Sequence, residues 1–212
     1  GVVEVDLSAI RPMIALPMHP SNAFTIEELN ANLEDILHAC EEDVQKLIGR
    51  KDVHLDLCSK IENGKLRVDQ GVIAGCAGGL YDSIYEAASI LKGRTGGCGD
   101  YALSVYPGSQ PIMMELVRTG VISELMASGA TVRTAFCGPC FGAGDVPANG
   151  ALSIRHTTRN FPSREGSKPG NGQLAGVALM DARSIAATTA NGGILTPATD
   201  IDYDPTVPEY QY

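Results

Sequence analysis

Residues 71–79 read Gly-Val-Ile-Ala-Gly-Cys-Ala-Gly-Gly, an apolar run that passes into a glycine-rich turn. The apolar run predicts a short buried strand, and the residues near 81–93 that follow the turn predict a helix. The segment 101–105 (Tyr-Ala-Leu-Ser-Val) predicts the next strand. This order of elements is typical of α/β proteins, in which helices join the strands of one sheet.

The alternation continues toward the C-terminus. We expect further helices at about 109–118, 121–128 and 181–190, and further strands at 131–136, 152–156 and 174–180. Strands that alternate with helices predict a mainly parallel sheet with helices on both faces, which is a three-layer α/β/α fold.

The N-terminal part of the chain has a different pattern. Residues 1–24 are expected to be an extended lead-in, because recurring prolines exclude a helix there. Thr25 and Glu28 have the spacing of a capping box, in which each side chain caps the backbone of the other. Apolar residues at helical spacing then predict a helix over 25–48.

A hairpin is expected over residues 53–69, because polar and apolar residues alternate on either side of an Asn63-Gly64 turn. Residues 200–212 are rich in Asp, Pro and Tyr, which predicts an exit segment or linker. We therefore expect one domain over 1–199. The chain starts at Gly1 rather than Met, which suggests an excised domain that holds only part of a site.

Charge and hydropathy exclude two classes of partner. The formal net charge is −9, from 16 Lys and Arg against 25 Asp and Glu, without a Lys/Arg cluster. Nucleic-acid binding needs a basic face, so we expect no nucleic-acid partner. No apolar run approaches the roughly 18 residues of a membrane helix, and no signal peptide is present, so we expect a cytoplasmic protein without a membrane partner.

The cysteines indicate thiol, metal or redox chemistry, because the chain is neither short nor obviously secreted. Six are present, at positions 40, 58, 76, 98, 137 and 140. Cys137-Gly-Pro-Cys140 is a C-x-x-C motif, which binds a metal or cluster or forms a disulfide. Its Gly and Pro flanks leave backbone N–H groups free for sulfur, and interrupt the helix expected after a redox motif.

A third cysteine favours a cluster over a redox pair. Cys76 and Cys137 each follow a predicted strand, so they are expected at the carboxyl edge of one sheet, where α/β proteins bind ligands. Three cysteine ligands leave one metal open to substrate as a Lewis acid. Cys40, Cys58 and Cys98 are less favoured fourth ligands, and Cys40 has the apolar neighbours of a core residue.

Three arginines, Arg155, Arg159 and Arg164, occur in the ten residues 155–164, which begin in the predicted strand 152–156. A guanidinium binds a carboxylate through two hydrogen bonds, so this loop suits an acidic substrate, although surface solubility would explain it as well. His156 has the position of a structural strand residue. Asp100, Asp145 and Asp181 have ordinary capping or loop explanations, so no residue has the pattern of a general base.

At these residues the chain resembles the aconitase superfamily of iron–sulfur hydro-lyases. The resemblance covers roughly 1–199 and only the third domain of a four-domain enzyme. The matching pieces, in family order, are Asp6-Leu-Ser, Gly75-Cys76, Val105-Tyr-Pro-Gly-Ser109, Cys137-Gly-Pro-Cys140 and Arg159-Asn-Phe-Pro-Ser-Arg164.

The resemblance implies that Cys76, Cys137 and Cys140 hold a [4Fe-4S] cluster whose fourth iron binds the substrate's hydroxyl and carboxylate. It implies that Arg159 and Arg164 bind substrate carboxylates. The catalytic serine and its partners come from other domains of the parent enzyme, so no catalytic residue is assigned in this chain. The expected reaction is reversible dehydration of a hydroxy di- or tricarboxylic acid, and the isolated chain is expected to be inactive and to lose its cluster in air.

The chain departs from the family pattern at several places. Ala77-Gly-Gly follows the first cysteine where Thr-Asn is common, Thr158 stands where Asn is usual, and the segment 40–69 with its hairpin is divergent. Two alternatives therefore stay open. One is a non-catalytic iron–sulfur or zinc sensor with four ligands, and the other is a thiol-redox protein that uses Cys137 and Cys140.

Overall fold

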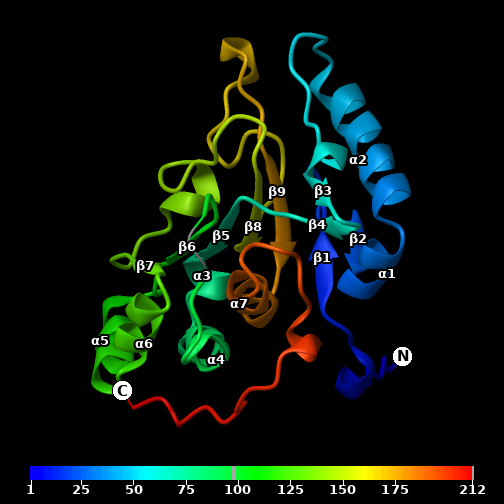
Figure 1. Cartoon of the computed structure of the whole chain (residues 1–212). Helices are drawn as coiled ribbons and strands as arrows, with labels where there is room; N and C mark the ends of the chain where they lie inside the picture. The colour runs from blue at the N-terminus through cyan, green and yellow to red at the C-terminus, as the bar shows by residue number, and fades with distance from the viewer. Residues whose placement is uncertain (97–98, 212) are drawn as a thin grey trace.

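The computed structural model describes residues 1–96 and 99–211. Its centre is a seven-stranded sheet with the strand order β2-β1-β9-β8-β5-β6-β7 (Figure 1). The five strands from β9 to β7 are parallel, and β1 and β2 are antiparallel to their neighbours. The strands are β1 (Met13–Ala15), β2 (Ala23–Thr25), β5 (Gln70–Ile73), β6 (Ala102–Val105), β7 (Thr131–Val132), β8 (Leu152–His156) and β9 (Gly176–Met180).

Seven α-helices accompany the sheet in the described part of the chain. They are α1 (Ile26–Ala31), α2 (Leu33–Ile48), α3 (Gly75–Gly78), α4 (Tyr81–Leu91), α5 (Gln110–Arg118), α6 (Val121–Ala127) and α7 (Ala182–Ala190). The mostly parallel sheet with its packed helices is consistent with the expected three-layer α/β/α fold. Among the described residues, no helix is both long and apolar enough to cross a membrane.

Helices α4 and α7 pack on each other, and α7 also packs on the central strands β5 and β8. A glycine makes this packing possible. A Cβ at Gly71 of β5 would lie only 3.1 Å from the Ile185 side chain of α7 and 3.2 Å from Leu103 of β6. Gly71 and the buried Ile73 face the helices, so the alternate residue Val72 faces the opposite side of the sheet.

The predicted helix starts are confirmed where a capping side chain is present. Thr25 and Glu28 form both hydrogen bonds of a capping box at α1, and Ser109 and Asp181 cap α5 and α7. The single helix expected over 25–48 is interrupted, because Asn32 leaves the helical conformation with φ −138°. The chain therefore forms two helices, α1 and α2.

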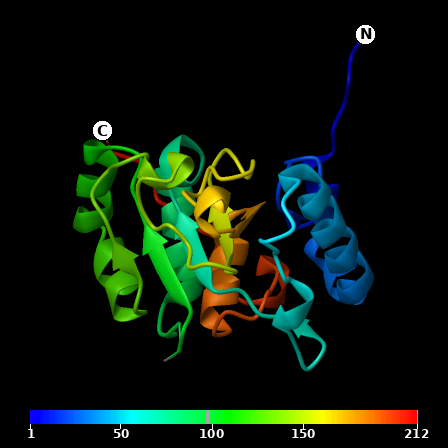
Figure 2. The ribbon, with the colours of Figure 1, turned by 90° about the horizontal axis from the view of Figure 1, so that it is seen from above.

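The extended lead-in expected at 1–24 contains two strands that the sequence did not predict. Ile14 of β1 is fully buried, and β1 pairs with both β2 and β9. Strands of three residues between prolines give almost no periodic signal, which is why they were missed. Residues 1–10 extend from the body of the molecule (Figure 2), and their apolar side chains are exposed.

The hairpin expected over 53–69 is confirmed only at its turn. Strands β3 (Ile61–Glu62) and β4 (Lys65–Leu66) pair across Asn63-Gly64. The preceding residues 53–57 do not form a strand, although the apolar members of the alternation are buried as expected. The expected strand over 131–136 is likewise shorter, since β7 ends at Val132.

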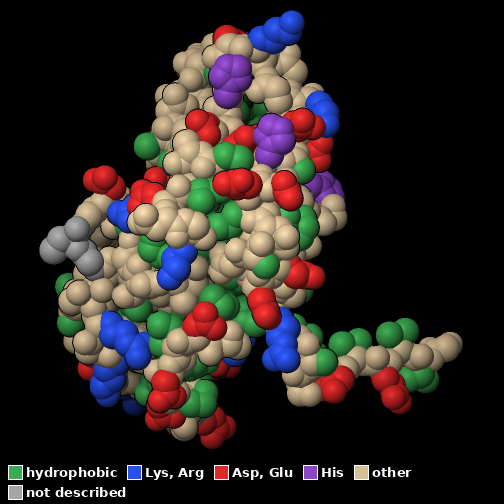
Figure 3. Space-filling model, turned by 45° about the vertical axis from the view of Figure 1, so that its right-hand side comes forward, with side chains coloured by type: hydrophobic (Ala, Val, Ile, Leu, Met, Phe, Trp, Pro, Cys, Tyr) green, Lys and Arg blue, Asp and Glu red, His purple; other side chains and the backbone are tan. Residues whose placement is uncertain are grey.

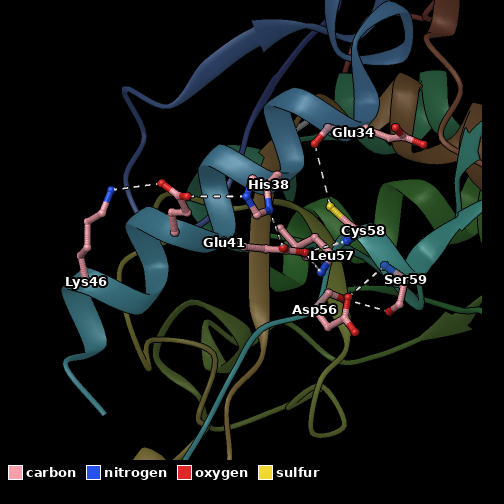
Figure 4. A network of polar contacts seen from close by, with 9 residues as sticks. Glu34, His38, Glu41, Lys46, Asp56, Leu57, Cys58 and Ser59 are labelled. Atoms are coloured by element: carbon pink, nitrogen blue, oxygen red, sulfur yellow. Dashed lines mark hydrogen bonds and ion pairs between the residues drawn. The ribbon is translucent and has the colours of Figure 1, made fainter. Parts of the chain in front are cut away.

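The segment before the hairpin is held on α2 by a carboxylate (Figure 4). Glu41 accepts hydrogen bonds from the backbone N–H groups of Leu57, at 2.5 Å, and Cys58, at 2.7 Å. His38 lies 3.8 Å from the same carboxylate. The contacts explain how a stretch without strand pairing is fixed to the body of the molecule.

The C-terminal segment runs back across the helices toward α5 and α6 (Figure 1). Tyr203 and Val207 pack against the main core, and the rings of Tyr81 and Tyr210 are 5.3 Å apart. Arg94 donates a hydrogen bond to the carbonyl oxygen of Asp202 at 3.1 Å. On the face in Figure 3, acidic and basic side chains are interspersed.

Candidate functional site

The candidate site lies at the carboxyl edge of the parallel strands. Cys76 belongs to α3, which begins two residues after β5, and Arg159 follows the end of β8. Strands β5 and β8 are paired in register, with Ile73 opposite His156, so both connections leave the sheet at the same level. The C-x-x-C motif follows β7, and the one-turn 3-10 helix Gly138–Phe141 carries its second cysteine.

The turn after β5 lies directly against the C-x-x-C motif. Gly75 has φ +73°, and a Cβ placed on it would lie 2.8 Å from the Sγ atom of Cys140. Any L-residue is strained at this φ, and a side chain would push against the sulfur. Gly75 is therefore required for the approach of residues that are 65 positions apart in the chain, 140 − 75.

The three cysteines differ in exposure. Cys140 is 3% exposed, whereas Cys76 and Cys137 are exposed. Burial raises the pKa of the Cys140 thiol, and neighbouring Cys137 and Cys76 raise it further, while a hydrogen bond from the backbone of Thr158 lowers it. The sulfurs of Cys137 and Cys76 are thus near enough to that of Cys140 to act on it electrostatically.

The less favoured fourth ligands lie in another part of the molecule. Cys40 is buried on α2, with its Sγ atom 3.0 Å from the carbonyl oxygen of Pro17, and burial raises its pKa to about 12. Cys58 lies beside α2, with its Sγ atom 3.9 Å from the carbonyl oxygen of Glu34 (Figure 4). Cys98 lies outside the described residues.

No three His, Cys, Asp or Glu side chains within 1–96 and 99–211 converge closely enough to hold a single metal ion. Two hollows of about 620 and 750 Å³ lie elsewhere, one beside α7 and Asp200 and one on α2. At the cysteine edge, Cys76 and Cys137 are exposed, and two half-exposed aromatic rings lie beside the C-x-x-C motif. Phe136 and Phe141 are each 50% exposed and meet edge to face at 6.0 Å.

The loop after β8 contains several buried polar atoms that lack a partner. Of the five such side-chain atoms in the described structure, three belong to this loop, Thr157 Oγ1, Asn160 Oδ1 and Arg164 Nε, and a fourth, His156 Nδ1, belongs to the last residue of β8. Buried polar groups are normally paired, so this concentration suggests a loop whose partners include another molecule. Arg159 is exposed, and its guanidinium donates one hydrogen bond, to Thr158 Oγ1 at 3.2 Å.

Asn160 holds the same loop in place. It is 1% exposed, and its Nδ2 atom donates hydrogen bonds to the carbonyl oxygens of Leu16, at 2.7 Å, and Ala15, at 3.3 Å. The arginine loop is thereby attached to the end of β1, a strand that the sequence did not predict.

Comparison with known proteins identifies the family of the chain. The aconitase family model (aconitate hydratase) matches residues 1–187, most of the chain. The chain belongs to the aconitase family.

The relatives of this aconitase-family chain include large subunits of 3-isopropylmalate dehydratase. That of Caldanaerobacter subterraneus is 32% identical over 186 residues, which are 87% of this chain and 36% of the relative. That of Moorella thermoacetica is 30% identical over 196 residues, 92% of this chain and 37% of the relative. The chain thus spans little more than a third of the relatives' length. They are hydro-lyases, which supports a hydratase family for this chain.

The three arginines grouped by the sequence have different environments. Arg155 is not a surface or substrate-facing residue, because it is 1% exposed on the face of the sheet opposite α4 and α7. Burial lowers its pKa to about 10, so it stays protonated at neutral pH. Arg164 is partly buried. Arg159 is the most accessible of the three, and alternation along β8 explains why Arg155 points into the protein.

Asp145 has a larger structural role than the ordinary loop explanation allowed. Its carboxylate accepts hydrogen bonds from the Tyr106 hydroxyl at 2.5 Å and from Ser104 Oγ at 3.0 Å, and Arg133 lies 3.6 Å away. Burial, followed by Asp145, raises the pKa of Tyr106 to about 12. Nothing in the spacing of these residues could have revealed the contact, since Asp145 and Tyr106 are 39 positions apart.

The Ala77-Gly-Gly departure is explained by the end of β8. A Cβ on Gly78 would lie 2.9 Å from the Cβ of His156, so Gly78 leaves no room for the larger residue common in the family. Burial lowers the pKa of His156, which favours the neutral ring. The packing fits the structural role expected for this histidine.

Proposed function

We propose that this chain is the cluster-carrying part of an aconitase-like hydro-lyase. The observation that carries the proposal is the approach of the Cys76 turn to Cys140, with Cys137 beside it, at the edge where Arg159 and Arg164 emerge. Family membership supports the same reading. Cys76, Cys137 and Cys140 are the proposed ligands of a [4Fe-4S] cluster.

The donor set fits a cluster better than a single ion. Thiolates are soft ligands that favour iron–sulfur clusters. A cluster binds each cysteine through a different iron, so its ligands need not converge on one point as those of a single zinc ion must. Hydrogen bonds to sulfur tune such sites, and the backbone of Thr158 offers one to Cys140.

When bound, the cluster would supply an open iron that acts as a Lewis acid toward the substrate's hydroxyl and carboxylate groups. The residues of this chain would bind and orient the substrate. The exposed fork of Arg159 suits a carboxylate, and the unpaired Nε of Arg164 leaves it a donor for a second one. The proposed substrate is therefore a hydroxy di- or tricarboxylic acid, a class that includes isopropylmalate.

The remaining parts of the site are proposed to come from outside this chain. The relatives are large subunits, so an additional subunit or domain is expected to cover the cysteine edge and its exposed aromatic rings. It would also supply the group that takes the proton, so the isolated chain would be inactive. The five described cysteines are free thiols, which suits a cytoplasmic location, where thiols stay reduced.

The test is anaerobic reconstitution with iron and sulfide, followed by iron analysis, absorbance and EPR. Wild type and single Ser variants of all six cysteines are compared. We expect cluster loss only in the Cys76, Cys137 and Cys140 variants. Loss with Cys40, Cys58 or Cys98 as well would support the four-ligand sensor. Absence of a cluster beside a titratable Cys137–Cys140 disulfide would support the redox protein.

A further inference from the structure

Arg155 is the largest fully buried side chain in the described structure. Its Nε atom donates to Ser153 Oγ at 2.9 Å, and its Nη2 atom donates to Gln70 Oε1 at 3.2 Å. A buried cation is stable only when its donors have acceptors, and every acceptor of this guanidinium is a neutral oxygen. The other hydrogen bonds of Arg155 go to the loop Cys137–Asp145, which contains the C-x-x-C motif.

The guanidinium contacts the backbone of the loop on both sides of Cys140. Nη1 donates to the carbonyl oxygen of Pro139 at 2.7 Å, and Nη2 donates to that of Asp145 at 2.6 Å. A guanidinium is planar and rigid, so two bonds from one fork fix the positions of two carbonyl groups relative to each other and to β8. The segment between them includes Cys140.

The same loop is also attached to β6. The Asp145 carboxylate accepts hydrogen bonds from Ser104 and Tyr106, as described above. Val72, Ser104 and Arg155 are opposite one another in the register of β5, β6 and β8. Ser104 and Arg155, from the same face of the sheet, therefore hold the loop, although neither belongs to the cysteine motif.

We propose that Arg155 is a positioning residue, which holds the Cys137–Asp145 loop so that Cys140 faces Gly75 and Cys76 before any cluster binds. Its effect on the cluster rests on the proposed function. Its effect on the loop does not, because the contacts are made to backbone carbonyl groups of the chain itself. If Arg155 contributed only to overall stability, its replacement would loosen the whole molecule equally.

The experiment measures alkylation of the native, cluster-free chain by short pulses of N-ethylmaleimide. Tryptic peptide mapping gives separate rates for Cys140 and for Cys40, a cysteine equally buried but on α2. In Arg155→Lys we expect Cys140 to react at least tenfold faster than in wild type, with Cys40 unchanged. Arg133→Lys is the matched control, since Arg133 also lies near Asp145 but is 50% exposed, and both rates should stay at the wild-type value.

Ser153→Ala is the milder variant, needed if Arg155→Lys unfolds and exposes Cys40 as well. It removes the acceptor of Nε and leaves the cation in place, and we expect about a threefold faster reaction at Cys140 alone. Unchanged Cys140 rates in both variants would overturn the proposal. The proposal would also be overturned if the alkylation rate of Cys40 rose as much as that of Cys140 in both variants.

Anaerobic reconstitution gives a second readout. Wild type should form a cluster with a defined EPR spectrum after reduction, and Arg155→Lys should bind less iron or give shifted g-values. Wild-type iron content and g-values in that variant would overturn the link to the cluster. If wild type forms no cluster, the proposed function fails, and the alkylation rates still decide whether Arg155 positions the loop.

Discussion

Replacement of Gly75 by alanine is the sharpest test of the contact between the turn after β5 and the cysteine motif. Gly75 and Gly64 have nearly the same φ, +73° and +74°, but their surroundings differ. A Cβ on Gly75 would lie 2.8 Å from Cys140 Sγ, whereas a Cβ on Gly64 meets nothing within 4 Å. The two substitutions therefore share the backbone strain and differ in the steric contact.

The expected loss of stability follows from the backbone strain and the steric contact. A left-handed conformation costs an L-residue about 1–2 kcal/mol, which applies to both variants. Forcing a methyl group into a packed site costs about 1–3 kcal/mol more, which applies only to Gly75→Ala. We expect Gly64→Ala to lower the free energy of unfolding by about 1–2 kcal/mol and Gly75→Ala by about 2–5 kcal/mol.

Urea unfolding of the cluster-free protein measures the difference, and reconstitution measures its consequence at the site. Gly75→Ala should also reduce cluster occupancy, because Cys140 has to move, whereas Gly64→Ala should retain the wild-type occupancy. Equal destabilisation by both variants, together with equal iron content, would refute the contact between Gly75 and Cys140.

Three further outcomes are expected. Glu41→Ala should cost about 1–3 kcal/mol in urea unfolding, because two backbone N–H groups lose their acceptor, while Glu42→Ala, at a 56% exposed side chain, should change stability by less than about 0.5 kcal/mol. Cys40 has a folded-state pKa of about 12 against an ordinary 9.0. The contribution of its buried neutral thiol to the free energy of unfolding is therefore present below pH 9 and lost as the pH rises toward 12. Unfolding from pH 8 to 11 should therefore show a smaller loss in Cys40→Ala than in wild type, and parallel curves would contradict this. Arg159→Lys in the proposed complete enzyme should raise KM about tenfold or more, since a lysine cannot form the bidentate contact. The melting temperature of the protein should stay unchanged, because Arg159 is exposed.

Local signals determined most of the secondary structure. The strands from β5 onward were predictable because they are short apolar runs, and β6 and β9 are each followed by a helix with its own capping side chain, Ser109 at α5 and Asp181 at α7. Such features depend on neighbours within one turn or one strand. The antiparallel strands β1 and β2 were not predictable, because β1 is a strand through its pairing with β9, 164 positions away at Ala15 and Leu179, and β2 is a strand through its pairing with β1.

The sequence by itself determined the α/β class, the alternation of elements and the placement of Cys76, Cys137 and Arg159 after strand ends. Only the tertiary structure decided which of these residues approach each other. It separated Arg155 from Arg159 by burial, made Asp145 an acceptor for Ser104 of β6 and for Tyr106 just after it, and placed Gly75 against Cys140. The physical reason is that periodicity records which face of an element is buried, whereas contacts between loops depend on how strands distant in sequence align in the sheet.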